Sequence, residues 1–271
     1  MTGQEELLPG GFVTEVVRIG DTVRRTRPAN ADFVEALLRH LERAAPGLAP
    51  RHLGYDERGR QVLSHVDGRV PWREREDPGY RGDAALTRLA ALIRRLHDAC
   101  AGTELAGAAQ TVCHLDLSPK NTVYRDSPEG PLPVALLDWD LAAPGRRIDD
   151  VAFAAWHFAE LGDGADPGEL GRRARLLCAG YDAAASATGT GATGRGAARD
   201  DTAGGGRLDR AELVDVMLHQ IEYTWRGIDA GADLDRPGMR RLRDAGAVDG
   251  VRAWQHWLVA HRDAVTAALL G

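Results

Sequence analysis

Two short motifs at a defined separation constrain this chain more than any other feature. His114, Asp116 and Asn121 stand in the pattern His-x-Asp-x-x-x-x-Asn. A hydrophobic run at 133–137 follows and ends directly at Asp138. The spacing lets a tight loop turn Asp116 and Asn121 toward one cleft, and a carboxylate at the end of a buried strand is held rigidly, as a magnesium ligand requires. The chain is therefore expected to fold so that three oxygen-bearing side chains meet.

These side chains are the ones that phosphoryl transfer needs. Asp116 is expected to accept the proton of an attacking hydroxyl, and Asn121 and Asp138 are expected to hold Mg²⁺ on nucleotide phosphates. His114 is expected to support the loop by hydrogen bonding. Ser118 has two readings, contact with a phosphate or the cap of a turn, and we favour the turn. The first motif alone also occurs by chance in unrelated proteins, but both motifs in order favour a kinase.

Composition and charge exclude several other classes of protein. The chain has 271 residues and a net charge of −6, so it lacks a basic footprint for nucleic acid. No apolar run approaches the ~20 residues of a membrane span, and the first residues do not resemble a signal peptide. The three isolated cysteines suit buried thiols in a reducing compartment. We expect a soluble, cytoplasmic protein that binds neither nucleic acid nor membranes.

Sequence periodicity predicts an α+β fold in two lobes. A run rich in β-branched residues lies at 12–19, and further strand-like runs lie at 22–26, 52–55, 61–66, 122–124 and 134–137. Apolar residues at helical spacing lie at 32–46, 82–102, 149–161, 169–184, 209–228 and 251–270. The order predicts a small antiparallel sheet with one helix, followed by a larger, mainly helical part.

The same patterns give the expected organisation along the chain. Residues 1–68 are expected to form an N-terminal nucleotide-binding lobe, with a connector at 62–68. Residues 69–271 are expected to form the C-terminal lobe, which carries the catalytic loop and the acceptor site. The low-complexity stretch 183–206 is too poor in apolar residues to offset its ordering entropy. We expect a flexible surface loop there, an inert insertion in preference to a substrate lid.

The two motifs, together with Asp150-Val151-Ala152, resemble those of the aminoglycoside phosphotransferase family. This family has the protein-kinase-like fold and belongs to a small-molecule branch that also holds choline kinases. The resemblance covers residues 10–159. It implies an ATP- and Mg²⁺-dependent transfer of phosphate to a hydroxyl, with antibiotic resistance as a family role. It also implies that Asp150 caps a helix and braces the catalytic loop.

The N-terminal lobe departs from the pattern of this fold at one position. A strand lysine normally grips the α- and β-phosphates, but the only lysine of this chain is Lys120, in the catalytic loop. By its place in the hairpin, Arg25 is the best substitute, although a planar guanidinium does not reproduce a compact ammonium. Glu35 is the candidate helix partner of Arg25, one residue away from the expected register.

Two further segments of this lobe are candidates for nucleotide contacts. Gly10 and Gly11 form either a turn over the phosphates or an ordinary hairpin turn. Ser64, His65 and Val66 either offer backbone groups to an adenine ring or form a plain edge strand.

The helical lobe is expected to bind the acceptor, a small and cationic molecule with a hydroxyl group. Acidic and aromatic side chains gather there, at Glu222, Tyr223, Trp225, Asp229, Asp233, Asp235, Trp254 and Trp257. Carboxylates suit an aminoglycoside, and aromatic rings suit a choline-like cation. Taken singly, each of these residues is better explained as core, for the tryptophans, or as solvated surface, for the carboxylates, than as a contact with the acceptor. An amino alcohol, a sugar or a macrolide stays open as acceptor, as does a nucleotide-binding regulatory protein with little catalysis.

Overall fold

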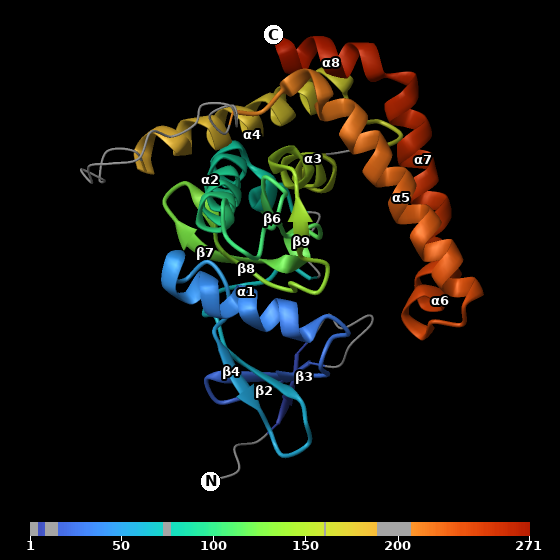
Figure 1. The fold of residues 1–271 in the computed structure, drawn as a ribbon. Coiled ribbons are helices and arrows are strands. Elements are labelled where there is room, and N and C mark those ends of the chain that lie inside the picture. The colour runs from blue at the N-terminus through green and yellow to red at the C-terminus, as the bar shows by residue number, and fades with distance from the viewer. Residues whose placement is uncertain (1–4, 9–15, 73–76, 160, 189–206) are drawn as a thin grey trace.

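The chain folds into two lobes, as Figure 1 shows for a computed structural model. The structure describes residues 5–8, 16–72, 77–159, 161–188 and 207–271. The N-terminal lobe lies at the bottom of the view, and the C-terminus lies at the opposite end of the molecule. The α+β architecture predicted from the sequence is confirmed, with a β-rich first part and a helical second part.

The N-terminal lobe is a five-stranded antiparallel sheet in the order β1-β2-β3-β5-β4. Its strands are β1 (Glu6–Leu7), β2 (Val16–Ile19), β3 (Thr22–Arg25), β4 (His52–Tyr55) and β5 (Gln61–Ser64). Helix α1 (Ala31–Ala44) contacts both β4 and helix α2 of the other lobe. Its apolar residues Leu37, Leu38 and Leu41 are buried. The helix therefore links the sheet to the rest of the molecule.

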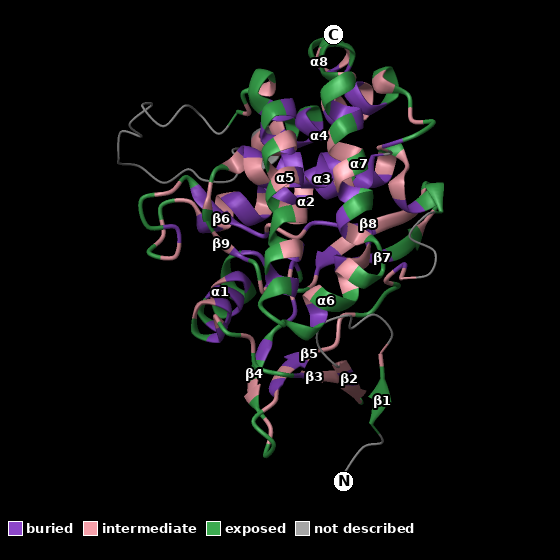
Figure 2. Ribbon diagram, turned by 90° about the vertical axis from the view of Figure 1, so that its right-hand side faces the viewer, coloured by how far each residue is buried: buried purple, intermediate pink, exposed green. Residues whose placement is uncertain are grey.

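The C-terminal lobe is built around α2 (Asp83–Cys100), whose leucine-rich face is fully buried. Two small sheets lie beside α2: β6 (Thr111–Cys113) pairs with β9 (Ala143–Gly145), and β7 (Thr122–Ser127) pairs with β8 (Gly130–Leu136). Short 3₁₀ turns, η1 (Pro78–Arg81) and η2 (Pro119–Asn121), precede α2 and β7. Figure 2 shows the buried residues concentrated in this part of the molecule.

Six further helices complete the lobe: α3 (Arg147–Phe158), α4 (Pro167–Thr188), α5 (Leu213–Asp233), α6 (Pro237–Asp244), α7 (Ala247–Ala260) and α8 (Arg262–Leu270). The turn η3 (Arg210–Glu212) leads into α5. Helix α4 packs on α2 and α8, and α5 and α7 run side by side with α6 at their far end (Figure 1). Among the described residues, every helix is too short or too polar to cross a membrane.

Three details of the helical lobe differ from the sequence prediction. The segment 251–270 was predicted as one helix, but the chain breaks at His261 into α7 and α8. Helix α6 was not predicted, because its arginine-rich sequence has only one large apolar pair and no periodicity. Of the low-complexity stretch, residues 183–188 form the end of α4, and 189–206 lie outside the described residues.

The lobes are joined by a connector that packs closely on β7. The backbone N–H groups of Arg69 and Tyr124 each donate to the other's carbonyl, both at 2.8 Å. Gly68 has φ +144°, and a Cβ there would lie 2.4 Å from Val123 Cγ1 and 2.6 Å from the Tyr124 carbonyl oxygen. Only glycine fits, because both the backbone angle and the close approach exclude a side chain. A lobe boundary at residue 68 stays a prediction.

Candidate active site

The registers of the two small sheets bring the predicted motifs together. Cys113 pairs with Ala143, and Thr122 pairs with Leu136, so the loops 114–121 and 137–142 begin and end at neighbouring positions. The backbone N–H of Leu137 also donates to the carbonyl of Asn121 at 2.8 Å. The two loops therefore lie alongside each other at the base of the N-terminal lobe.

Asp116 and Asn121 are hydrogen-bonded to each other within the first loop. Asn121 Nδ2 donates to Asp116 Oδ2 at 2.7 Å and to the Asp116 carbonyl at 2.8 Å. Within the described part of the chain, Asn121 Oδ1 accepts no hydrogen bond. This oxygen is therefore free to bind a metal ion, and hard oxygen ligands of this kind suit Mg²⁺.

Burial and neighbouring charges together raise the pKa of Asp116. Burial raises the pKa of its carboxyl above the ordinary value, the Lys120 ammonium 3.9 Å away opposes this shift, and the nearby Asp138 carboxylate adds to it. The side chain is 20% exposed, so it is partly accessible to solvent. A carboxylate with a raised pKa is a better proton acceptor than an ordinary one.

Each loop holds one non-glycine residue in the left-handed region of the backbone. Leu115 has φ 60° and Asp138 has φ 61°. A residue in this region is strained, and it is tolerated where the surrounding contacts determine the conformation. The Asp138 side chain is 48% exposed, so its carboxylate is accessible for a ligand.

His114 supports both loops from the interior. The ring is fully buried and packs on Trp139 with 4.5 Å between the ring centroids. Its Nε2 donates to the Leu137 carbonyl at 2.9 Å, and its Nδ1 accepts from the Asp116 backbone N–H at 3.3 Å. With both nitrogens engaged, His114 positions the loops and is not placed to transfer a proton to substrate.

Ser118 makes no capping bond, although the sequence favoured one. It stands at the N-cap of η2, but its buried Oγ has no hydrogen-bond partner. The backbone carbonyl of Ser118 instead accepts from Thr122 Oγ1 at 2.9 Å and from the N–H of Asn121 at 3.0 Å. The turn is therefore closed by its backbone.

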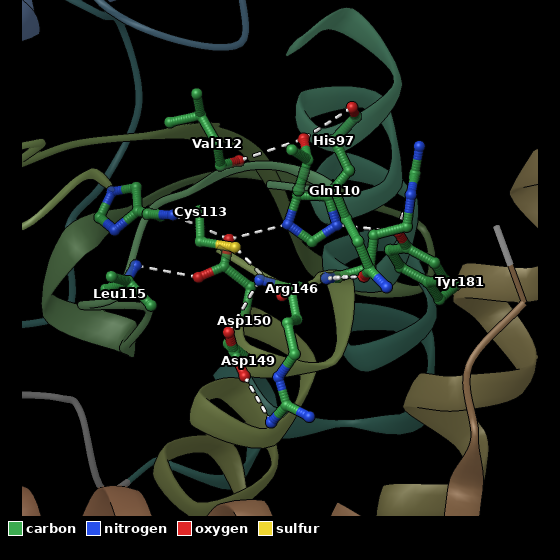
Figure 3. A network of polar contacts seen from close by, with 12 residues as sticks. His97, Gln110, Val112, Cys113, Leu115, Arg146, Asp149, Asp150 and Tyr181 are labelled. Carbon is green, nitrogen blue, oxygen red and sulfur yellow. Dashed lines mark hydrogen bonds and ion pairs between the residues drawn. The ribbon is translucent and has the colours of Figure 1, made fainter. Parts of the chain in front are cut away.

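Asp150 holds the backbone of the catalytic loop, as Figure 3 shows. Its Oδ2 accepts from the N–H of His114 at 2.8 Å, and its Oδ1 accepts from the N–H of Leu115 at 2.9 Å. The predicted helix cap was wrong, because Asp150 lies inside α3, and Asp149 accepts the N–H of Arg146 instead. Burial alone would raise the pKa of Asp150, but hydrogen bonds from His97 and His114 lower it overall.

Two buried residues that the sequence prediction did not include, His97 and Tyr181, form a hydrogen-bonded chain with Asp150. His97 Nε2 lies 3.0 Å from Asp150 Oδ2, and His97 Nδ1 lies 2.8 Å from the hydroxyl of Tyr181 (Figure 3). A signal was present: His97 falls on the apolar face of α2, where a polar side chain needs a partner.

His97, Asp150 and Cys113 offer ligand atoms that all lie within 4.8 Å of one another. In this structure the three side chains are engaged in hydrogen bonds with one another and with the backbone. Burial raises the pKa of the Cys113 thiol well above its ordinary value, and the thiol donates to the Arg146 carbonyl at 3.2 Å. These side chains form a hydrogen-bonded support for the loop.

Arg25 reaches from the N-terminal lobe to the second loop. Its Nε donates to Gln61 Oε1 at 2.8 Å, and its terminal nitrogens lie 3.3 Å from Asp138 Oδ1 and 2.5 Å from Asp140 Oδ1. Burial raises the pKa of Asp140, and the charge of Arg25 opposes this shift. The arginine thus contacts the loop that follows β8, including the carboxylate expected to bind metal.

Within the described residues, the expected pair of Arg25 and Glu35 does not form. Glu35 lies 3.6 Å from Arg39 on its own helix, 3.5 Å from His52 on β4 and 3.9 Å from Arg27. These partners turn its carboxylate toward the sheet edge, while the guanidinium of Arg25 is turned toward the cleft.

Backbone hydrogen bonds of residues 64–66 indicate which of them has groups left to bind an adenine ring. The N–H of Ser64 donates to the Arg51 carbonyl at 2.9 Å, and the N–H of His65 donates to the Asp21 carbonyl at 2.8 Å. Within the described chain, the N–H and C=O of Val66 have no such partner. Val66 is therefore the free position of the three. Gly10 and Gly11 lie outside the described residues.

The acidic residues on the helical arm formed by α5, α6 and α7 are paired with arginines. Asp229 and Asp233 both lie near Arg243, at 3.4 and 2.6 Å. Glu222 pairs with Arg226 and Asp235 pairs with Arg240 in the same way. These pairs weaken the expectation that this arm presents bare carboxylates to a cationic acceptor.

The aromatic residues of the arm have mixed environments. Trp257 is buried, and Tyr223 is 75% exposed. The ring of Trp225 lies 4.2 Å from the guanidinium carbon of Arg252, and its Nε1 donates to Gln255 Oε1 at 2.8 Å. The indole of Trp254 packs edge-on against another tryptophan at 6.1 Å. Of these rings, that of Tyr223 is the most accessible.

Comparisons with known proteins support the resemblance seen in the sequence. Residues 101–186 match the family model described as the phosphotransferase enzyme family, and this span includes both motifs and Asp150. The resemblance to this family is therefore confirmed. A trifolitoxin immunity protein from Rhizobium leguminosarum bv. trifolii is 35% identical over 175 residues, which are 59% of this chain. The match spans 64% of that relative, less than two thirds of its length.

Solved structures share the fold across both lobes. A choline/ethanolamine kinase family protein from Mesorhizobium loti has a TM-score of 0.59 with 16% identity, over 100% of this chain and 94% of its own. The GDP and kanamycin complex of APH(2")-IIia has a TM-score of 0.54 with 14% identity, over 91% of this chain and 94% of its own. At such low identity the likeness concerns the fold, and the protein-kinase-like fold is confirmed.

Proposed function

We propose that this protein is a phosphotransferase that moves the γ-phosphoryl group of ATP to a hydroxyl of a small molecule. The observation that carries the proposal is the meeting of Asp116, Asn121 and Asp138 in two adjacent loops, opposite Arg25 of the other lobe. A phosphotransferase family match and kinase-like neighbours support the same class of reaction.

The proposed reaction begins at Asp116. Its carboxylate accepts a hydrogen bond from the acceptor hydroxyl and takes the proton as the hydroxyl oxygen bonds to the γ-phosphorus. The bond from the γ-phosphorus to its bridging oxygen breaks, and ADP leaves with the electron pair. The amide of Asn121 holds the carboxylate of Asp116 in place throughout.

Oxygen ligands for Mg²⁺ are present at this site. Asn121 Oδ1 and the Asp138 carboxylate are hard donors; Asn121 is buried beside Asp116, and the Asp138 side chain is about half exposed. When bound there, Mg²⁺ supplies charge neutralisation for the nucleotide phosphates. Asn121 and Asp138 would be the protein ligands of Mg²⁺, and the carboxylate of Asp116 would remain available to accept the proton of the acceptor hydroxyl.

The nucleotide is placed by the N-terminal lobe. We assign the phosphates to Arg25, whose planar fork suits two phosphate oxygens in place of Asp138 and Asp140. The free backbone groups of Val66 are assigned to the adenine edge. GTP is the competing donor, because the neighbour with kanamycin was solved with GDP.

The acceptor is proposed to be an aminoglycoside-like or amino-alcohol compound. One structural neighbour was solved with kanamycin, and another belongs to the choline/ethanolamine kinase family. The relative named as an immunity protein adds its toxin, trifolitoxin, to the acceptors worth testing. The pairing of the acidic residues on the helical arm favours an acceptor that makes few ionic contacts there.

A thermal-shift screen followed by an activity assay tests the proposal. Aminoglycosides, amino alcohols and trifolitoxin are screened with Mg²⁺ and ATP or GTP, and hits are tested for phosphorylation by mass spectrometry. We expect a phosphorylated product with the wild type and a rate lower by about 10²–10⁴ with Asp116→Asn. An equal rate with that variant would remove Asp116 from its role.

The second candidate is a nucleotide-binding regulatory protein. It is favoured by the arginine in the lysine position, which is held by Asp138 and Asp140 in place of a helix glutamate. This candidate is supported if the wild type binds ATP tightly but transfers phosphate to no acceptor of the panel. In that case Asp116→Asn should bind ATP as tightly as the wild type.

A further inference from the structure

The only lysine of the chain lies in the catalytic loop. All other side chains that carry a permanent positive charge are arginines, and Lys120 alone carries an ammonium group. It stands within η2, between Pro119 and the buried Asn121. No proposed contact with the nucleotide or the acceptor has so far used it.

The position of its charge is well defined. Lys120 Nζ lies 3.9 Å from Asp116 Oδ2, the carboxylate oxygen that also accepts from Asn121. The Lys120 side chain is 40% exposed, and among the described residues Asp116 is its only ion-pair partner. The ammonium is thus held beside the proton acceptor, on a side chain that is partly exposed.

An ion pair this exposed contributes little to stability, roughly 0–1 kcal/mol. Fold stability therefore does not account for the position. The distribution of charges at the site offers a reason. Arg25 contacts Asp138 and Asp140, whereas Lys120 is the cation that lies next to Asp116. A transferring phosphoryl group must pass close to Asp116, because the hydroxyl that attacks it is bound there.

We propose that Lys120 is a catalytic residue whose ammonium contacts a non-bridging oxygen of the γ-phosphoryl group during transfer. The proposal rests on the proposed phosphotransferase function. As the acceptor oxygen bonds to phosphorus and the bond to ADP breaks, negative charge spreads over the three non-bridging oxygens. Lys120 donates hydrogen bonds to one of them and forms or breaks no covalent bond. A compact ammonium on a flexible stem fits between phosphate and carboxylate better than a planar guanidinium.

Kinetics of two variants test this role. Lys120→Met removes the charge with similar volume, and Lys120→Arg keeps the charge. We expect Lys120→Met to lower kcat by about 10²–10³ with a much smaller change in the nucleotide KM, because the ammonium already lies against the bound nucleotide and its contact strengthens in the transition state. We expect the kcat of Lys120→Arg to be at least tenfold higher than that of Lys120→Met. The Lys120 side chain is 40% exposed, and circular dichroism checks that both variants fold.

Chemical labelling gives a readout that does not depend on turnover. Because Lys120 is the only side-chain amine, acetylation with an N-hydroxysuccinimide ester modifies this residue and the chain's terminal amine, and peptide mass spectrometry separates the two. We expect Mg²⁺ with a non-hydrolysable ATP analogue to slow acetylation of Lys120 at least fivefold and to leave the terminal amine unchanged.

The outcomes separate the two proposals. Active wild type with an unchanged kcat in Lys120→Met, or with no nucleotide protection of Lys120, overturns the role of Lys120 and leaves the proposed function standing. Wild type that transfers phosphate to no acceptor, with either nucleotide, overturns the proposed function and the role of Lys120 with it.

Discussion

At the scale of single residues, one buried carboxylate determines how the catalytic loop is held. Asp150 is fully buried, and its two oxygens accept backbone N–H groups from His114 and Leu115 as well as a bond with His97. Leu115 has a left-handed backbone. Strain of this kind persists where the surroundings impose it, and the carboxylate of Asp150 is the group that does so.

Asp150→Asn is expected to lower the free energy of unfolding by about 3 kcal/mol at pH 7, because an amide cannot accept all the hydrogen bonds that the carboxylate accepts. The folded-state pKa of Asp150 is lowered. Its contribution is therefore complete above the unfolded pKa of about 4 and is lost as the pH falls further. Urea unfolding at several pH values measures this. A stability gap between wild type and variant that widens in acid would contradict it.

Arg25 gives a second prediction at this scale. Arg25→Met is expected to weaken nucleotide binding by about tenfold or more, because charge-assisted hydrogen bonds to phosphate are lost. Arg25→Lys is expected to keep most of the affinity. Isothermal titration calorimetry with Mg²⁺ and a non-hydrolysable ATP analogue measures both. If Arg25→Met binds the nucleotide as tightly as the wild type, Arg25 contributes only to the contact between the two lobes.

At the scale of elements, short strands and turns align the site. Strands β6 and β9 have three residues each, yet their register sets the start of one loop against the end of the other. The connector is fixed in the same way, by the mutual backbone bonds between Arg69 and Tyr124. The position of the N-terminal lobe over the loops depends on this attachment.

Gly68→Ala is expected to destabilise the protein by about 2 kcal/mol or more, because the backbone angle is strained for alanine and the new Cβ meets β7. Gly59→Ala is the matched control: Gly59 also has a positive φ, +72°, but no atom lies within 4 Å of the added Cβ. Urea unfolding compares the two. Equal losses would show that the close approach to β7 contributes nothing beyond backbone strain.

Elements with strong apolar periodicity could be predicted from the sequence, and weakly patterned ones could not. Helices α1 and α2 were placed nearly to the residue because leucine repeats on one face. Helix α6 has too few apolar residues for any period, and three-residue strands are too short for alternation. The break at His261 has no proline or glycine to mark it.

At the scale of the whole molecule, the two lobes meet through charge as well as packing. Arg25 of the sheet contacts two carboxylates of the C-terminal lobe, and α1 contacts α2. The meeting of Asp116 and Asn121 was predictable, because motif spacing is local. The partners of Glu35 and the link from Asp150 to His97 were not, because they depend on contacts between elements distant in the chain.

The measurement that tests the account most directly is binding of one divalent ion together with nucleotide. Mn²⁺ prefers the same oxygen ligands as Mg²⁺ and is followed by electron paramagnetic resonance. With a non-hydrolysable ATP analogue, we expect one tightly bound Mn²⁺ in the wild type. We expect affinity lowered at least tenfold in Asn121→Ala and in Asp138→Ala, and unchanged in the control Asp126→Ala, which alters an exposed carboxylate on β7. Equal Mn²⁺ affinity in all four proteins would contradict the account.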